Sequence, residues 1–218
     1  METQRTVYLY VLDGLADWEP GYAISGISMR EFQKAPGRYR VRTVGATRDA
    51  VRTMGGVTLL PDAALDEVGP EGSAMLILPG AESWAGGEHA AAVAKARAFL
   101  DAGVPVAAIC GATAGLARAG VLDGRRHTSN AAGFLAAIPG YGGSAGYVDE
   151  PAVLDGDLVT ASGTSPVDFA RKIFERLDLY EAPVLDAWYR LYKHGDASGF
   201  YALQAMQGQA GEGASTAG

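Results

Sequence analysis

The chain has 218 residues, of which 48% are hydrophobic and 20% are charged, and its formal net charge is −7. This length fits one α/β domain with an extension, and an acidic chain without a basic stripe argues against nucleic acid as a partner. A single cysteine excludes an internal disulfide and metal sites built on cysteine pairs, and three histidines argue against a histidine-rich metal site.

The N-terminus lacks the apolar core of a signal peptide. No apolar run approaches the roughly 20 residues that span a bilayer. We therefore expect a cytoplasmic protein with no membrane partner. The cysteine and histidine counts argue against a metal, and we also expect no cofactor and, for the reasons given below, a small-molecule substrate.

Along the chain, apolar runs alternate with amphipathic or alanine-rich segments. The apolar runs predict strands at 6–12, 74–78 and 158–161, and in the first half of 104–122. Alternation of polar and apolar residues predicts a half-exposed strand at 39–44, and a Gly-Gly turn signal precedes a further strand at 57–60. The other segments predict helices at 20–33, 88–102, 112–119, 131–139 and 166–177. This alternation predicts a three-layer α/β/α sandwich around a mostly parallel, doubly wound sheet, of the flavodoxin-like class.

The C-terminal part reads as an addition to this domain. Residues 1–206 are expected to form one domain, in which 182–206 are a helical extension with an aromatic stripe that includes Trp188 and Tyr192. Such a stripe is typical of a buried face or of a dimer surface. Residues 207–218 contain mostly Gly, Ala, Ser and Gln, which predicts a disordered tail.

The stretch 104–122, VPVAAICGATAGLARAGVL, predicts a strand, a tight turn and a helix, with Cys110 at the turn. The small neighbours Ala108, Gly111 and Ala112 meet the steric requirement of a nucleophile elbow. Unpaired N–H groups and the dipole at a helix N-terminus favour the thiolate form of a cysteine. The alternative is a buried, unreactive cysteine.

Ligands of parallel sheets bind outside the carboxyl ends of the strands. Three such ends carry notable residues: Glu19 follows the first strand, Gly80 and Ala81 follow the strand 74–78, and Cys110 lies at the elbow. We predict that these residues form one site. The alternative for Glu19 is an exposed acid in the first turn of a helix, where it stabilises the helix dipole.

Four segments match a known family in order and at family spacing: VLDGLADWEP, LPGAESW, AAICGATAGLARAGVLDGRRHTSN and LVTASGTSPVDFARKIFERL. They resemble the DJ-1/PfpI superfamily, which has the class I glutamine amidotransferase-like fold, over the chain to about residue 179. The resemblance implies that Cys110 is the nucleophile and that Glu19 is the carboxylate hydrogen-bonded to it. It also implies that Ala81 and Gly111 supply the backbone N–H groups of an oxyanion hole, and that the protein is a homodimer.

The chain departs from the family pattern at two positions. Many members follow the elbow cysteine with histidine, but here Gly111 follows it. Others use a histidine after the elbow helix, where the alignment of HTSN places Asn130, with His127 three residues earlier. Strand side chains alternate between faces, so His127 should face away if Asn130 faces the cysteine. This weakens a Cys-His protease mechanism and favours Cys-Glu chemistry.

Together with these residues, the resemblance implies a cysteine-dependent hydrolase, hydratase or glyoxalase-like lyase for a small carbonyl, amide or isonitrile substrate. Burial and a neighbouring thiolate both favour the neutral form of Glu19, so Cys110 and Glu19 should share protons as a coupled pair. A protonated Glu19 would act first as general acid and later as base.

Other interpretations of the site remain open. We expect Gly80, Trp84 and Asn130 to line the pocket, with Trp18 as a further wall, although either tryptophan could instead belong to the core. The alternative functions are a stress-response or redox sensor that uses oxidation of Cys110, and an intracellular protease or amidase. A binding module with a vestigial cysteine is the third alternative.

Overall fold

The computed structural model of the chain describes residues 4–215, with side chains described up to residue 207. Within these residues, nine strands have the following bounds: β1 Arg5–Tyr10, β2 Tyr39–Gly45, β3 Val51–Arg52, β4 Thr58–Leu59, β5 Ala63–Ala64, β6 Ser73–Leu78, β7 Val106–Ile109, β8 Ala152–Asp155 and β9 Leu158–Ala161. The main sheet has the order β5-β2-β1-β6-β7-β9-β8, and β3 pairs with β4 in a separate hairpin. Neighbours in the main sheet are parallel, except that β8 is antiparallel to β9.

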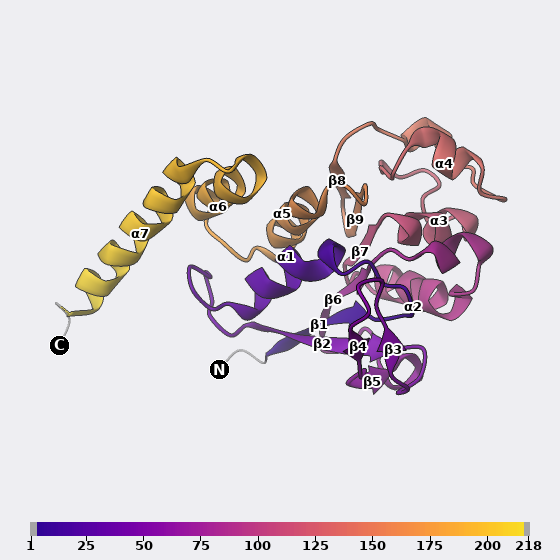
Figure 1. Cartoon of the computed structure of the whole chain (residues 1–218), viewed down its shortest axis with the longest axis horizontal. Coiled ribbons are helices and arrows are strands. Elements are labelled where there is room, and N and C mark those ends of the chain that lie inside the picture. The colour runs from indigo at the N-terminus through magenta and orange to yellow at the C-terminus, as the bar shows by residue number, and fades with distance from the viewer. Residues whose placement is uncertain (1–3, 216–218) are drawn as a thin grey trace.

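Helices cover both faces of this sheet (Figure 1). Helices α1 and α5 pack against each other, while α2 and α3 pack against β7 from the other side. This arrangement confirms the predicted three-layer α/β/α fold. The helix bounds are α1 Trp18–Ser28, α2 Ala90–Asp101, α3 Gly111–Arg118, α4 Ala132–Ala136, α5 Pro166–Leu177, α6 Ala182–His194 and α7 Ala197–Ser215.

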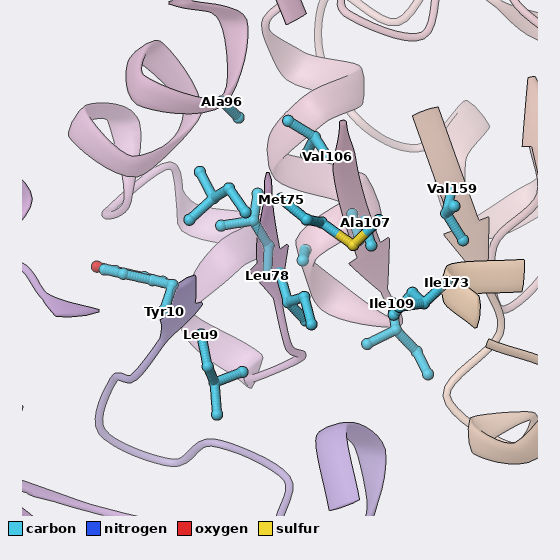
Figure 2. Packing of buried hydrophobic residues seen from close by; sticks show 14 of the residues in the cluster. Leu9, Tyr10, Met75, Leu78, Ala96, Val106, Ala107, Ile109, Val159 and Ile173 are labelled. Carbon is cyan, nitrogen blue, oxygen red and sulfur yellow. The ribbon is translucent and has the colours of Figure 1, made fainter. Parts of the chain in front are cut away.

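The central strands are buried along their whole length, because helices shield both of their faces. Every residue of β6 and β7 is buried. Figure 2 shows Met75 and Leu78 of β6 and Ile109 of β7 packing within one cluster that also contains Val159 of β9 and Ile173 of α5. These rigid strands hold their carboxyl ends, and the loops that follow, at one edge of the sheet.

Helix α1 ends earlier than the predicted 20–33. It stops at Ser28, and Phe32 has a positive φ of 64°. The side-chain amide of Gln33 donates hydrogen bonds to the carbonyl oxygens of Gly26 and Met29, at 3.1 and 2.6 Å. These bonds satisfy carbonyl groups that the last helical turn leaves without partners, so the chain can turn away.

Helices α6 and α7 form the C-terminal extension, and α7 points away from the sheet (Figure 1). The predicted aromatic stripe packs within the chain: the ring of Trp188 lies 5.1 Å from that of Phe174 in α5. The structure differs from the predicted disordered tail at 207–218, because α7 continues through Ser215. Residues 216–218 lie outside the described part of the chain. No helix within residues 4–215 has the length and apolarity needed to cross a bilayer.

Candidate active site

Cys110 occupies a strained turn between β7 and α3. Its φ is 56° and its ψ is −125°, values that L-residues rarely adopt and that are typical of a nucleophile elbow. The backbone holds this conformation from both sides. The Cys110 N–H donates to the carbonyl oxygen of Ala161 at 3.0 Å, and its carbonyl oxygen accepts hydrogen bonds from the backbone N–H and the hydroxyl of Thr113. The side chain is half-buried and lines a cavity of about 290 Å³.

Glu19 lies in the first turn of α1 and is only 1% exposed. Its Oε2 accepts a hydrogen bond from the backbone N–H of Gly80 at 2.5 Å, and its carboxyl group lies beside Cys110, because a Cβ at Gly163 would lie within 3.1 Å of both Glu19 Oε1 and Cys110 Sγ. This burial excludes the alternative of an exposed acid at the helix terminus. The structure therefore brings together the ends of β1, β6 and β7.

Two glycines confine the Cys110–Glu19 pair. A Cβ at Gly80 would lie 2.7 Å from both the Cβ of Cys110 and Oε2 of Glu19. A Cβ at Gly163, in the loop after β9, would lie 2.8 Å from Cys110 Sγ and 3.1 Å from Glu19 Oε1. Any larger residue at either position would displace the pair. Sequence reasoning missed Gly163 as a site residue.

Asn130 joins this loop to the nucleophile. Its Nδ2 donates a hydrogen bond to Cys110 Sγ at 3.3 Å, and its Oδ1 accepts one from the backbone N–H of Gly163 at 2.9 Å. His127 is fully buried elsewhere, with Nδ1 2.8 Å from the carbonyl oxygen of Arg125 and Nε2 2.7 Å from the hydroxyl of Tyr141. The prediction that His127 faces away from the cysteine is confirmed.

Burial sets the electrostatics of the pair. It raises the pKa of Glu19 to about 7, although hydrogen bonds from Gly80 and Cys110 oppose the shift. Burial also raises the pKa of the Cys110 thiol, and the negative charge of Glu19 acts in the same direction, while hydrogen bonds from Asn130 and the Gly111 N–H oppose it. The expected preference for a thiolate at the helix N-terminus is therefore outweighed. Just above pH 7 Glu19 is ionised while the thiol beside it keeps its proton, because burial and that negative charge both raise the pKa of the thiol.

The cavity beside Cys110 includes most of the predicted pocket residues. Gly80, Ala81, Gly111 and Asn130 all line it, as does Trp18. The sequence did not point to two further apolar walls, Met54 between β3 and β4 and Phe134 of α4. Among the residues that the structure describes, no three His, Cys, Asp or Glu side chains gather in a way that could hold a metal ion.

Trp84 does not line this cavity, contrary to the prediction. It is 1% exposed, and its indole N–H donates to the carbonyl oxygen of Pro79 at 2.9 Å. The glycines of α3 make room for the indole, since a Cβ at Gly115 would lie 2.6 Å from its ring. Trp84 instead packs against Gly111 and Gly115 of α3 and borders a second cavity, of about 470 Å³, beside α2 and α3.

Ala81 and Gly111 approach each other closely. A Cβ at residue 111 would lie 2.3 Å from the carbonyl oxygen of Ala81. With the backbone in this position, residue 111 has no room for a side chain. Both residues border the cavity next to Cys110, where an oxyanion hole would have to be. That the N–H groups of Ala81 and Gly111 form an oxyanion hole remains a prediction.

Comparison with known proteins places the chain in a family. The model of the DJ-1/PfpI family matches residues 5–176. The chain belongs to the DJ-1/PfpI family. A Bacillus subtilis member, named "Uncharacterized protease YoaZ", is 39% identical over 91% of this chain and 96% of its own length.

Two solved structures of the family are also similar. A thiJ/pfpI family protein from Bacillus anthracis is 37% identical, with a TM-score of 0.86 over 94% of this chain and 98% of its own. A DJ-1 superfamily protein from Agrobacterium tumefaciens is 30% identical, with a TM-score of 0.79 over 88% of this chain and all of its own (100%). The DJ-1/PfpI fold therefore extends over nearly the whole chain.

Replacing Asn130 by Ala should slow the reaction of Cys110 with electrophiles near neutral pH. The Asn130 amide stabilises charge on Sγ, so its loss should raise the pKa of the thiol further. We expect the pH profile of alkylation by iodoacetamide to move to higher pH and the rate at pH 7 to fall by roughly tenfold, which is one pKa unit. An unchanged profile in a variant with wild-type melting temperature would contradict this role.

Proposed function

We propose that this protein is a cysteine-dependent enzyme that acts on a small electrophile through Cys110, with Glu19 as its acid/base. The observation that carries this proposal is the confinement of thiol and carboxyl between Gly80 and Gly163, at a strained elbow that opens on a cavity. A buried carboxyl with a pKa of about 7 suits proton transfer in both directions at neutral pH.

The proposed first step moves one proton and forms one bond. Sγ of Cys110 attacks the electrophilic carbon of a carbonyl substrate while the thiol proton passes to the Glu19 carboxylate. The carbonyl π pair moves to oxygen, where the N–H groups of Ala81 and Gly111 would stabilise the charge. The protonated Glu19 then donates to that oxygen, which yields a hemithioacetal and restores the carboxylate. Isonitrile or amide substrates would need water as a second reactant.

A protease or amidase is the second candidate, because a relative with 39% identity carries the name of a protease. Amide cleavage requires protonation of a leaving amine, and His127 lies away from the site. Glu19 would have to supply that proton. Cleavage of fluorogenic peptides by the wild type, but not by Cys110→Ser, would favour this candidate.

The experiment that tests the proposal is a substrate panel run on the wild type and on Cys110→Ser. The panel contains methylglyoxal, small amides, isonitriles and the fluorogenic peptides. We expect turnover of at least one small substrate by the wild type and none by Cys110→Ser. If no member is turned over, and mild peroxide instead adds two oxygens to Cys110 in a Glu19-dependent manner, the redox-sensor alternative replaces the enzyme.

A further inference from the structure

The charges around the Cys110 cavity have one sign. Glu19 lies beside the sulfur. Glu82 also lines the cavity; it is the exposed first residue of the 3₁₀ turn Glu82–Gly86, which follows β6. No described residue that lines this cavity is Lys, Arg or His. Two of the residues that line the cavity therefore carry a carboxyl group and none carries a cation, while the guanidinium of Arg118 lies behind the lining, hydrogen-bonded to the carbonyl oxygen of Ala85.

Asp17 adds a third acid near the rim. Its carboxylate accepts a hydrogen bond from the backbone N–H of Gly55 at 2.7 Å, next to Met54, which lines the cavity. Hydrogen bonds from Thr53 and Gly55 hold the pKa of Asp17 below its usual range, so it is ionised at neutral pH. The other lining side chains, among them Trp18, Met54, Phe134 and the neutral amide of Asn130, carry no charge. Positive potential comes from the backbone N–H groups at the N-terminus of α3.

We propose that Glu82, together with Glu19, makes the cavity select uncharged or cationic electrophiles and reject those that carry a carboxylate near the reactive carbon. This inference rests on the proposed function and narrows its substrate class. We take the Glu82 carboxylate and a carboxylate on the substrate to lie about 8 Å apart, with an effective dielectric constant between that of a protein surface and that of water. Their repulsion then lowers the rate of productive encounters by about fivefold. Glu82 is then a specificity-determining residue that takes no part in the chemistry.

The test compares two alkylating agents that differ in charge. Iodoacetamide is neutral and iodoacetate is anionic; in both reactions the sulfur–carbon bond forms, iodide leaves, and the thiol proton passes to Glu19 or to solvent. Cys110 is the chain's one cysteine, so intact mass counts a single product. The rate ratio of the two agents is measured on the folded protein and, as the reference for intrinsic reactivity, on the same protein unfolded in urea.

We expect the folded wild type to prefer iodoacetamide about fivefold more strongly than the unfolded chain does, and added salt to reduce this excess. Glu82→Gln should at least halve the excess, and Glu82→Lys should bring the ratio to that of the unfolded chain or below it. Glu88→Gln is the matched control: it removes the same charge from an exposed residue that does not line the cavity. Its ratio should equal that of the wild type.

Equal ratios in the folded and unfolded wild type would overturn the inference, as would equal effects of Glu82→Gln and Glu88→Gln. The alkylation ratio does not depend on turnover. If no substrate of the panel is turned over but the folded protein still prefers iodoacetamide, the result counts against the proposed enzyme alone. Turnover of neutral and carboxylate-bearing analogues at equal rates would count against the charge selection alone.

Discussion

Glu19→Gln should stabilise the folded protein above pH 7 and leave its stability near pH 4.5 almost unchanged. Burial raises the pKa of Glu19 from 4.5 to about 7 on folding. Below pH 4.5 the Glu19 carboxyl is protonated in both the folded and the unfolded protein, so it does not lower the free energy of unfolding. Between pH 4.5 and 7 only the unfolded chain releases the proton, so stability falls as pH rises, and above pH 7 the cost is complete.

The size of this effect follows from the shift. A difference of about 2.5 pKa units corresponds to about 3 kcal/mol. Glutamine is neutral at every pH, and the pKa of about 7 already includes the hydrogen bond that the Gly80 N–H donates to the carboxylate. The expected gain at pH 8 is therefore about 3 kcal/mol, or roughly 6–12 °C in melting temperature for a chain of this size.

Urea unfolding of both proteins at pH 4.5 and pH 8 measures this gain. Glu88→Gln provides the control, because a surface substitution of this kind changes stability by no more than about 0.5 kcal/mol. A gain of equal size at both pH values would show that ionisation of Glu19 is not its cause. A loss of stability at pH 8 would show that the carboxylate itself is needed for folding.

The sequence predicted the parts of the site that depend on local rules. The central strands are apolar on both faces because helices cover both, so continuous runs such as 74–78 identified them directly. The elbow at Cys110 needs small neighbours for steric reasons, and that pattern is contiguous in the chain. The carboxyl-end rule of parallel sheets then placed Glu19 and Gly80 beside it, as the structure does.

The parts that the sequence did not predict depend on contacts between distant segments. Gly163 matters because its Cα lies against Cys110 and Glu19, and only the folded sheet creates that contact. Trp84 follows the right strand but turns under α3, into space left by Gly115. Strand β8 was missed although Gly156, with φ 58°, forms a tight turn before β9, a hairpin signal readable from Asp155-Gly156.

The largest kinetic effect should come from the same residue, Glu19. If its carboxylate accepts the thiol proton, kcat/KM of the wild type should rise with pH and level off above about pH 7, where Glu19 is ionised. Glu19→Gln removes the proton acceptor, so kcat/KM at pH 7.5 should fall by roughly 10²–10⁴-fold, the usual contribution of general acid–base catalysis. The inflection near pH 7 should disappear from its profile.

A second readout separates this loss from a structural defect. The charge of Glu19 raises the pKa of the Cys110 thiol, so Glu19→Gln should lower that pKa, which the ultraviolet absorbance of the thiolate reports directly. The variant should thus have a more readily ionised cysteine, a more stable fold at pH 8 and far less activity. Misfolding cannot produce that combination. Glu19→Asp keeps a carboxylate on a shorter side chain and should recover part of the rate together with a pH inflection. Wild-type turnover in Glu19→Gln, or an inflection that persists near pH 7, would mean that another group accepts the proton.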